Sequence, residues 1–527
     1  MNISFIPNFL LKPLLKITPL GLFYRMRKNI TRSEKNTKKI ITLGITDFLV
    51  KRGEQRALYI LKETAKRVPA YENFLKEKGY SQNDVENAKS IKDAPISDKA
   101  SYIRPNEEHP ADLCMDGQMS PAKMIETSSG YSGKHTYWLR DLKEVLREER
   151  QIPVLLSIFY DVSDDEAFAI NGFALSSWVT GIQAGNASRR KTATINIGLN
   201  PPEIAQTIAD FYKRYSIKFT PGGFKKALIM SYPPTIKTIL DILDEMKFNE
   251  WDNIEETIFV SGGDGFPESY REYIKNKTGG TLFSAYGSAD TGIQVGIEAP
   301  DLIQLRGYLD KNPELCRQFF GKDHPPMLFY YDPTHVYIEV VPAETGINEL
   351  ILTPLYERRQ PLIRYNMHDE GGVFYNPKSP KSELTDLLNL TQIELEYTLP
   401  IVYVYGRSDG SIAVFSAYVY PQQIQAAIFR NLAEEFCQHL HISSEYSENQ
   451  KPQLVVDVCV SSKPSSEQID SLNSDILNSN EDLGIILSEG LADPPKINFY
   501  SKEDWPWETA RGPGQKERYL GAKRKNE

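Results

Sequence analysis

The sequence predicts an α/β fold in which a large N-terminal part precedes a smaller C-terminal part. Its 527 residues are enough for two to four domains of ordinary size. Between residues 128 and 369, short β-rich runs alternate with helical stretches and with glycine or proline, which is typical of an α/β sheet. The pattern of residues changes after residues 406–410, which carry glycine and charge, so we place a domain boundary there.

The composition is that of a soluble globular protein with a large core. Apolar residues make up 40% and charged residues 25%, and the mean hydropathy is −0.42. The net charge of −9 has the wrong sign for general nucleic-acid binding, so we expect no nucleic-acid partner. The four cysteines are far apart and form no CxxC pair, which fits a reducing cytoplasm. Cys316 with His324 or His335 offers too few clustered ligands to predict a zinc site.

Residues 1–39 differ from the rest of the chain in their charge. They contain nine basic residues and one acid, interleaved with large apolar residues. No run approaches the roughly 20 apolar residues that span a bilayer, and Pro7, Pro13 and Pro19 should interrupt a helix, so we expect neither a transmembrane segment nor a signal peptide. Two alternatives remain: the segment packs its apolar side chains on the main body, or it makes peripheral membrane contact.

An amphipathic helix is predicted over residues 55–68, because apolar residues recur there at helical spacing until Pro69. We predict strands at residues 191–197, 217–220, 257–260, 281–285, 335–341 and 349–355. In the C-terminal part we expect a helix over residues 422–437, a strand over 453–460, and a surface loop and helix over 461–482.

The clearest unit is a strand, a glycine turn, a helix and a second strand. Strand 257–260 leads through residues 261–264 into a helix with Pro267 near its first turn and Gly279 beyond its end. The next strand ends in a second glycine turn. Since ligands of open α/β sheets bind outside the carboxyl ends of strands, residues 262–264 and 286–290 should line one crevice.

Residues 127–136 combine hydroxyls, two glycines and a lysine, a pattern typical of phosphate binding. Glycines let backbone N–H groups turn towards an anion, hydroxyls donate further hydrogen bonds, and the lysine supplies charge. The pattern is not a Walker P-loop, because Ser128 and His135 stand where glycine and Ser or Thr are required.

At this point the chain resembles the adenylate-forming superfamily of acyl-CoA synthetases, most closely its phenylacetate-CoA ligase-like branch. The resemblance runs from about residue 55 to the carboxyl end. Five segments carry it in the family's order: residues 128–134, 261–264, 286–290, 361–369, and 406–409 followed by Pro421. It implies a basic and apolar extension (residues 1–50), a large ATP- and acyl-binding domain (51–406) and a small mobile α+β domain (407–527).

The resemblance also implies a nucleotide site. The loop at residues 128–134 would hold the phosphates, Tyr286 would stack on adenine, Asp369 would accept the ribose hydroxyls, and Arg407 would bind ribose and phosphate oxygens. The implied ATP-binding residues are Ser128, Ser129, Gly130, Ser132, Gly133, Lys134, Gly263, Asp264, Ala285, Tyr286, Gly287, Asp369 and Arg407.

Several positions depart from the family pattern. Asp290 stands where the family has a metal-binding glutamate, and its shorter stem can still bind magnesium. Tyr131 and Ala289 replace threonines, and Met367 and His368 replace a Thr-Gly pair.

Three further roles follow from the resemblance. Arg407 and Lys516 would be catalytic, although matching Gly514 to the family's glycine puts Gln515 in the lysine position, and only a one-residue slip supplies Lys516. Asp409 would be the hinge of the small domain. An acyl pocket would draw on Phe173, Trp178 and Phe224, which favours an aryl or apolar acid.

The implied activity is magnesium- and ATP-dependent conversion of a carboxylic acid to an acyl-adenylate, followed by transfer to coenzyme A. A cytoplasmic enzyme, able to form a homodimer, is expected. The alternatives are transfer to a carrier protein, amine or cofactor, or a nucleotide-binding homologue that has lost turnover.

Overall fold

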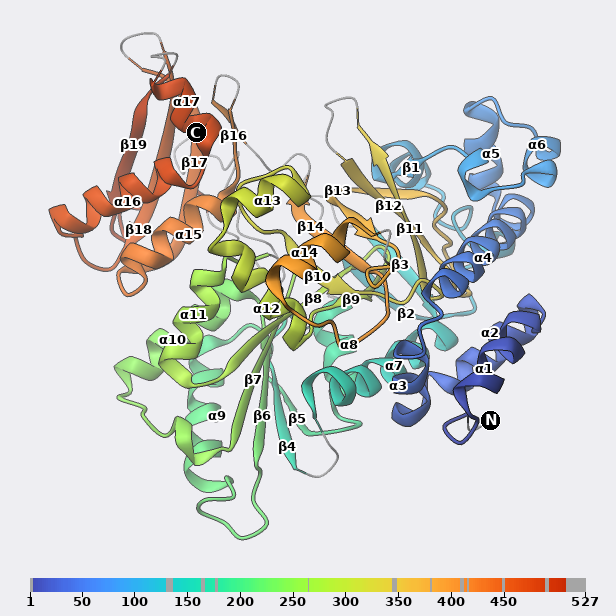
Figure 1. Ribbon diagram of the computed structural model, residues 1–527, viewed down its shortest axis with the longest axis horizontal. Coiled ribbons are helices and arrows are strands. Elements are labelled where there is room, and N and C mark those ends of the chain that lie inside the picture. The colour runs from blue at the N-terminus through green and yellow to red at the C-terminus, as the bar shows by residue number, and fades with distance from the viewer. Residues whose placement is uncertain are drawn as a thin grey trace.

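The computed structural model describes residues 3–128, 136–162, 166–175, 179–263, 265–343, 348–379, 382–407, 412–414, 417–447, 451–488 and 492–508. Figure 1 shows a central body of sheet and helices, with the first helices at one end and the last elements of the chain at the other. The predicted α/β class is confirmed by this mixture of one large sheet with helices around it.

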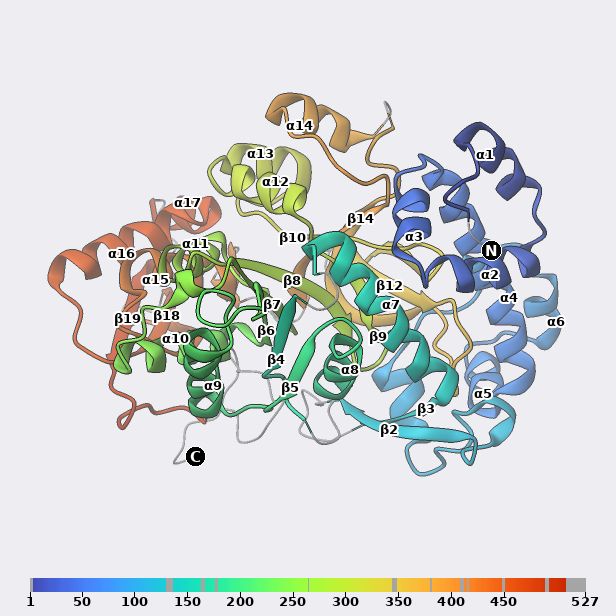
Figure 2. The same ribbon diagram turned by 90° about the horizontal axis from the view of Figure 1, so that it is seen from below.

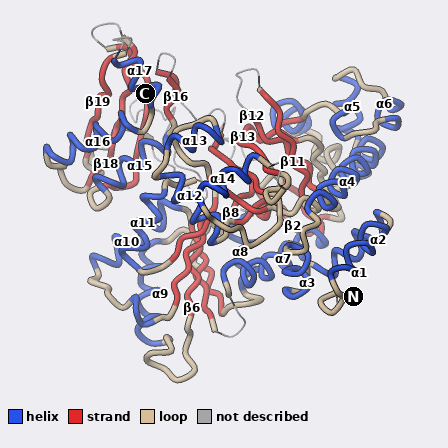
Figure 3. Tube along the Cα trace, in the orientation of Figure 1, coloured by secondary structure: helices blue, strands red, loops and turns tan. Residues whose placement is uncertain are grey.

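One large sheet organises the body. Its strands are β1 (Ser97–Asp98), β4 (Ala167–Asn171), β5 (Ala193–Asn196), β6 (Lys226–Ser231), β7 (Glu256–Gly262), β8 (Thr281–Ser288), β9 (Gly292–Ile297), β10 (Met327–Tyr330), β11 (Val336–Pro342), β12 (Asn348–Pro354), β13 (Tyr365–Phe374) and β14 (Ile401–Arg407). The order is β11-β12-β13-β14-β10-β9-β8-β7-β6-β4-β5, with β1 beside β13. Strands β5, β4, β6, β7 and β8 are parallel neighbours, and the pairs from β8 to β11 are antiparallel. Figure 3 shows these strands crossing the body.

Both faces of the parallel part are buried. In β4, Phe168 and Ile170 belong to one hydrophobic cluster, whereas Ala167 and Ala169 belong to another. Because successive side chains of a strand point to opposite faces, this alternation places one cluster on each side of the sheet.

Helices cover the two faces. Residues of α4 (Thr46–Arg67), α9 (Pro201–Arg214), α10 (Pro233–Glu245) and α11 (Glu268–Thr278) join the first cluster. Residues of α7 (Leu142–Tyr160), α12 (Pro300–Asp310), α13 (Pro313–Phe320) and α14 (Glu383–Thr391) join the second. Figure 2 shows α9 and α14 on opposite sides of the sheet. The shorter helices α5 (Pro69–Glu77), α6 (Gln82–Asn87) and α8 (Val179–Ser188) complete the body.

Most predicted elements lie where the sequence places them, with two corrections. Residues 217–220 form a turn, in which the Ile217 amide donates to the Phe224 carbonyl at 2.9 Å, because the following Pro-Gly-Gly sequence reverses the chain. The predicted helix over 422–437 is α15 (Pro421–Leu432), which ends earlier, since Phe436 already pairs with Val460 in a strand. The helix predicted from residue 55 begins earlier, at Thr46, in α4.

The N-terminal residues form three short helices, α1 (Asn8–Ile17), α2 (Leu20–Ile30) and α3 (Glu34–Ile41), around a small hydrophobic cluster. Pro7 and Pro19 occupy N-cap positions, as expected of helix boundaries. The expectation that Pro13 interrupts a helix is wrong: it lies inside α1, on an exposed face where water can bond the carbonyl that lacks its amide donor. Within the described ranges, every helix is too short or too polar to cross a membrane.

The chain beyond β14 forms its own sheets and hydrophobic cluster. Its elements are β15 (Ile412–Val414), β16 (Ala417–Val419), α15, β17 (Phe436–Tyr446), β18 (Pro452–Val460), α16 (Ser466–Asn478), α17 (Glu481–Ser488) and β19 (Asp493–Tyr500). Strand β18 is antiparallel to β17 and parallel to β19. The division into domains 1–50, 51–406 and 407–527 stays a prediction.

Candidate active site

The two glycine turns predicted to share a crevice are neighbours. Strands β7 and β8 are parallel, and Gly262 at the end of β7 pairs with Ala285 in β8. Gly263 follows with a φ of 90°, a conformation that side chains other than glycine rarely adopt. A Cβ on Gly287 would lie 2.5 Å from the Ile293 carbonyl oxygen, so the close approach of β8 and β9 also requires glycine. Both turns lie at the carboxyl ends of parallel strands, where open α/β sheets bind their ligands.

Tyr286 and Asp369 lie together at this end of the sheet, from segments 83 residues apart. The Tyr286 hydroxyl donates to Asp369 Oδ2 at 2.7 Å, and its ring stacks on Phe329 with centroids 5.6 Å apart. Burial, then the negative charge of Asp369, raises the pKa of Tyr286 well above its ordinary value, so the phenol remains a donor. The ring and the carboxylate predicted for adenosine are therefore held in one orientation.

Strand pairing brings the Arg407 position to the same place. Asp369 in β13 pairs with Arg407 at the end of antiparallel β14, directly after Glu370 pairs with Gly406. Gly406 has a φ of 131°, which turns the chain as it leaves the sheet. The Arg407 backbone thus lies beside Asp369, whereas its side chain falls outside the described part of the chain.

We expect Asp369→Asn to raise the KM for ATP about ten- to hundredfold, because a charged hydrogen-bond acceptor is lost. Tyr286→Phe should have a smaller effect, since the ring is kept and only the hydroxyl is removed. Steady-state kinetics of pyrophosphate release would measure both changes, with the exposed Asp470→Asn as the matched control. An ATP KM in Asp369→Asn equal to that of the control would contradict the assigned role.

Asp290 occupies a more constrained position than the sequence suggests. Its Oδ2 accepts the Tyr365 hydroxyl at 2.8 Å and lies 3.3 Å from Lys99 Nζ, and Arg358 donates to its backbone carbonyl at 2.6 Å. Two contacts hold the side chain, and the third holds the backbone of the same residue. Tyr365 lies within a segment that carries the family resemblance, but nothing local in the sequence indicates that Lys99 or Tyr365 meets Asp290.

The donor set fits a metal ion that arrives with a nucleotide. Mg²⁺ in nucleotide sites is held by one or two carboxylates together with substrate phosphates. Asp290 supplies one carboxylate, although Lys99 competes for it. The part of the chain that the structure describes contains no group of three or more His, Cys, Asp and Glu residues suited to a metal ion. A stand-alone magnesium site is therefore not supported by these residues.

A buried arginine ties the hairpin of the phosphate loop to the Asp290 turn. The hairpin consists of β2 (Ala122–Ser128) and β3 (Thr136–Asp141), and residues 129–135 of its connection lie outside the described residues. Arg140 in β3 pairs with Glu126 at 2.9 Å and Glu144 at 3.4 Å, and it donates to the Ala289 carbonyl. Sequence reasoning missed this network because its members are far apart along the chain.

His368, which replaces a glycine of the family pattern, is held between two acids. Its Nδ1 lies 3.2 Å from Glu349 and its Nε2 lies 3.5 Å from Asp98. The hydrogen bond to Asp98, and then Glu349, raises the pKa of His368 above its ordinary value against a smaller effect of burial. Its φ of 60° is the left-handed conformation that the replaced glycine would adopt freely.

We expect the protonated form of His368 to stabilise the fold. Because its folded pKa is raised, this contribution is complete below the unfolded pKa of about 6.5 and is lost as pH rises through the folded value. The melting temperature should therefore fall more steeply above that pH in the wild type than in His368→Asn, which tolerates the same φ. Parallel pH slopes for the two proteins, with exposed His109→Asn as control, would contradict this.

Phe173 and Phe224, both predicted for the acyl pocket, lie at opposite ends of the parallel strands. Phe173 follows β4 at its carboxyl end and lies against the glycine turn, since a Cβ on Gly262 would be 3.9 Å from its ring. Phe224 precedes β6 and therefore lies at the amino ends of the parallel strands, where its ring packs on Phe168 and Phe211. Phe224 is half-buried and packs against the core on this side of the sheet, and its role in an acyl pocket stays a prediction. The spacing of the sequence did not show at which end of the strand it would lie.

Several predicted residues cannot be placed. Of the phosphate loop, only the backbone of Ser128 is within the structure's ranges. The others outside the described residues are Ser129, Gly130, Ser132, Gly133, Lys134, Trp178, Asp264, Asp409 and Lys516. Their roles stay predictions.

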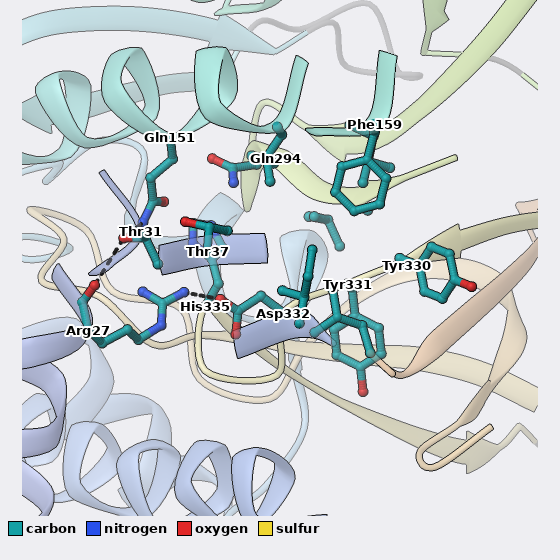
Figure 4. A pocket seen from close by; sticks show the side chains of 16 residues that line it. Arg27, Thr31, Thr37, Gln151, Phe159, Gln294, Tyr330, Tyr331, Asp332 and His335 are labelled. Atoms are coloured by element: carbon teal, nitrogen blue, oxygen red, sulfur yellow. Dashed lines mark hydrogen bonds and ion pairs between the residues drawn. The ribbon is translucent and has the colours of Figure 1, made fainter. Parts of the chain in front are cut away.

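A small pocket of about 60 Å³, partly open to solvent, lies elsewhere, between the N-terminal helices and the body (Figure 4). It is lined by Arg27 and Thr31 from α2, by Gln151 from α7, and by residues of β9 and β10. It includes Tyr330 and Ile297, which belong to the cluster on the face opposite Tyr286 and Phe329. No residue predicted for nucleotide binding lines it, so the pocket is not the candidate active site.

Comparisons with known proteins agree with this architecture. No protein-family model matches the chain, and no curated protein matches it in sequence. Solved structures of 2-hydroxyisobutyryl-CoA ligase do match. In its postadenylation state with 2-HIB-AMP, the ligase gives a TM-score of 0.63 at 14% identity, over 90% of each chain. In complex with R3-HIB-AMP, the score is 0.62 at 14% identity, again over 90% of each chain.

A third structure shows that ligase in its thioesterification state with 2-HIB-AMP and CoA. It gives a TM-score of 0.51 at 14% identity, over 89% of this chain and 88% of the other. At such low identity, the structural agreement establishes a shared architecture of sheets and helices over nearly the whole length. The chain therefore has the same fold as 2-hydroxyisobutyryl-CoA ligase.

Proposed function

We propose that this protein uses ATP to convert a carboxylic acid to an acyl-adenylate and then transfers the acyl group to coenzyme A. The observation that carries the proposal is the convergence of the β7 and β8 turns with Asp369 and the Arg407 position, since this gathers four of the five segments of the family pattern. The fold-level likeness to a CoA ligase crystallised with an acyl-AMP and CoA supports it.

The chemistry needs positioning more than a protein nucleophile. A carboxylate oxygen of the acid attacks the α-phosphorus of ATP, the bond to the bridging oxygen breaks, and pyrophosphate leaves with that electron pair. The thiol of coenzyme A then attacks the acyl carbon, AMP leaves, and the thiol proton is released. Rate enhancement comes from aligning the reactants and neutralising charge on the phosphates.

Different residues of this chain would align the reactants and neutralise the phosphate charge. Tyr286 and Asp369 would hold adenosine in one orientation, and Arg407 would contact ribose and phosphate oxygens. The Ser128 to Lys134 loop would bind the β- and γ-phosphates. Asp290 would hold a magnesium ion brought by ATP, which neutralises phosphate charge.

The acid is proposed to be aryl or apolar. Phe173 lies beside the Gly262 turn and packs edge-on against Tyr232 at 5.0 Å, so an aromatic wall stands next to the predicted nucleotide site. Trp178 would add to this wall. A phenylacetate-CoA ligase-like subtype, a cytoplasmic location and a homodimer belong to the same proposal, as does rotation of residues 407–527 about Asp409 between the two steps.

A second function, nucleotide binding without turnover, is favoured by the two contacts that the Asp290 side chain makes. Lys99 and Tyr365 both engage the Asp290 oxygen that a metal ion would use, and Ala289 lacks the family's hydroxyl. A homologue that binds nucleotide without turnover would show this arrangement. Transfer to a carrier protein, amine or cofactor is the alternative within enzymes.

The test is pyrophosphate release by the full-length protein over a broad panel of carboxylic acids, with and without coenzyme A. We expect acid-dependent pyrophosphate release by the wild type and coenzyme A-dependent release of AMP. Asp369→Ala should reduce both rates, whereas Asp470→Ala should reduce neither. ATP binding without pyrophosphate release on any acid would favour the nucleotide-binding homologue, and AMP release independent of coenzyme A would favour another acceptor.

A further inference from the structure

The N-terminal helices expose an apolar surface that their own packing leaves uncovered. We define the outward face as the exposed apolar residues of this unit: Phe5, Phe9, Leu10, Leu14, Ile17 and Leu22. Phe5 is 85% exposed, Phe9 73% and Ile17 78%. Single exposed apolar residues are common, but six within eighteen residues form a concentration that calls for a partner.

Helix α1 is apolar on two opposite sides. Leu11 and Leu15 point into the N-terminal cluster and are fully buried. Residues advance by about 100° around a helix, so Phe9, Leu10, Leu14 and Ile17 fall within about 140° on the other side. One side of α1 therefore holds the unit together, while the outward face is free to bind a different apolar surface.

Positive charge is concentrated in the same N-terminal residues as the outward face. Residues 1–39 carry a net charge of +8, whereas the rest of the chain carries −17, from a total of −9. Six of the nine bases are exposed in this unit: Lys16, Arg25, Lys28, Arg32, Lys35 and Lys38. The only acid, Glu34, pairs with Lys191 of the body. A second copy of this acidic chain could neutralise charge, but exposed apolar residues and exposed bases in the same helical unit match an anionic lipid surface more completely.

The unit is fixed to the body, so its outward face has a defined direction. Arg27 pairs with Asp332, and Gln151 donates to Thr31 at 2.9 Å across the pocket of Figure 4. In Figures 1 and 2, α1 lies at the edge of the molecule, at the end opposite α16. A flat surface can therefore approach α1 without meeting the C-terminal elements.

We propose that the outward face binds the surface of an anionic phospholipid bilayer. The apolar side chains enter the boundary between headgroups and acyl chains, and the exposed bases of the same unit contact lipid phosphates. Because the helices are short, the protein lies on the membrane and does not cross it. Binding at this end leaves the predicted nucleotide site and the C-terminal elements in water.

Co-sedimentation of the full-length protein with vesicles tests this proposal. One vesicle preparation is phosphatidylcholine alone, and the other adds phosphatidylglycerol in a comparable amount. We expect binding to the anionic vesicles that weakens with added salt. Phe9→Ser with Ile17→Ser, and separately Lys16→Glu with Lys28→Glu, should each weaken it at least about tenfold.

The control exchanges two exposed apolar residues of the body, Phe219→Ser with Leu390→Ser, and should leave binding unchanged. Thermal melts establish that each variant remains folded. Equal binding by the Phe9/Ile17 variant and the control would overturn the proposal, as would failure of the wild type to bind anionic vesicles. Light scattering without lipid decides the remaining outcome: a wild-type dimer that Phe9→Ser with Ile17→Ser makes monomeric, without vesicle binding, would make the outward face a dimer interface and overturn the proposal.

Discussion

Replacing Arg140 with methionine is expected to lower the free energy of unfolding by about 3–5 kcal/mol. Arg140 is 4% exposed, and its partners Glu126 and Glu144 are 0% and 3% exposed. Burial alone would lower the pKa of Arg140, but the two carboxylates outweigh burial and raise it. Methionine fills similar space, leaves Glu126 buried without the cation of its ion pair, and leaves Glu144 with Arg358 at 3.5 Å.

Two comparisons isolate the buried charge as the cause. Arg67 forms a close pair with Asp116 at 2.6 Å on the surface, where both side chains are nearly half exposed, so Arg67→Met should cost less than about 1 kcal/mol. Adding Glu126→Gln to Arg140→Met should recover part of the loss, because one stranded charge is removed. Urea titrations measure all three proteins, and an equal loss in Arg67→Met and Arg140→Met would refute the argument.

Lys516→Ala is expected to reduce kcat for pyrophosphate release about 10²- to 10³-fold, with a smaller change in the KM for ATP. This is the usual effect of removing one preorganised charge that stabilises a transition state. The expectation rests on the resemblance of residues 511–518 to the family's closing glycine-lysine segment.

Two tail variants serve as comparisons for Lys516→Ala. Lys523→Ala removes a lysine from the same tail and should keep the wild-type rate. Gln515→Ala tests the other alignment. Wild-type kcat in Lys516→Ala would remove this lysine from the mechanism, and a loss confined to Gln515→Ala would move the role to that position.

Local patterns made the β7-to-β8 unit predictable. The glycine turn after β7, the proline before α11 and Gly279 at its end each need only their own neighbours to act. Gly279 has a φ of 70° and caps α11, as the sequence implies. Parallel pairing then places both turns at one edge, which topology alone dictates.

Contacts between distant segments were beyond sequence reasoning. Lys99 follows β1, and Arg140 lies in the separate β2-β3 hairpin, so their contacts with Asp290 and with the Ala289 carbonyl depend on how these segments pack on the large sheet. The contact of Phe224 with Phe168 was equally beyond local patterns, since an aromatic side chain at either end of a strand gives the same local pattern. Pro13 lies within a helix because its environment is exposed, a feature that composition does not record.

The central claim is that one ATP molecule binds where Tyr286, Asp369 and the β7 and β8 turns meet. Isothermal titration calorimetry of magnesium-ATP into folded wild-type protein and into Asp369→Ala tests it most directly. The account predicts one binding site per chain in the wild type, with affinity about ten- to hundredfold weaker in the variant. No detectable binding to the folded wild type, or identical affinity in both proteins, would contradict it.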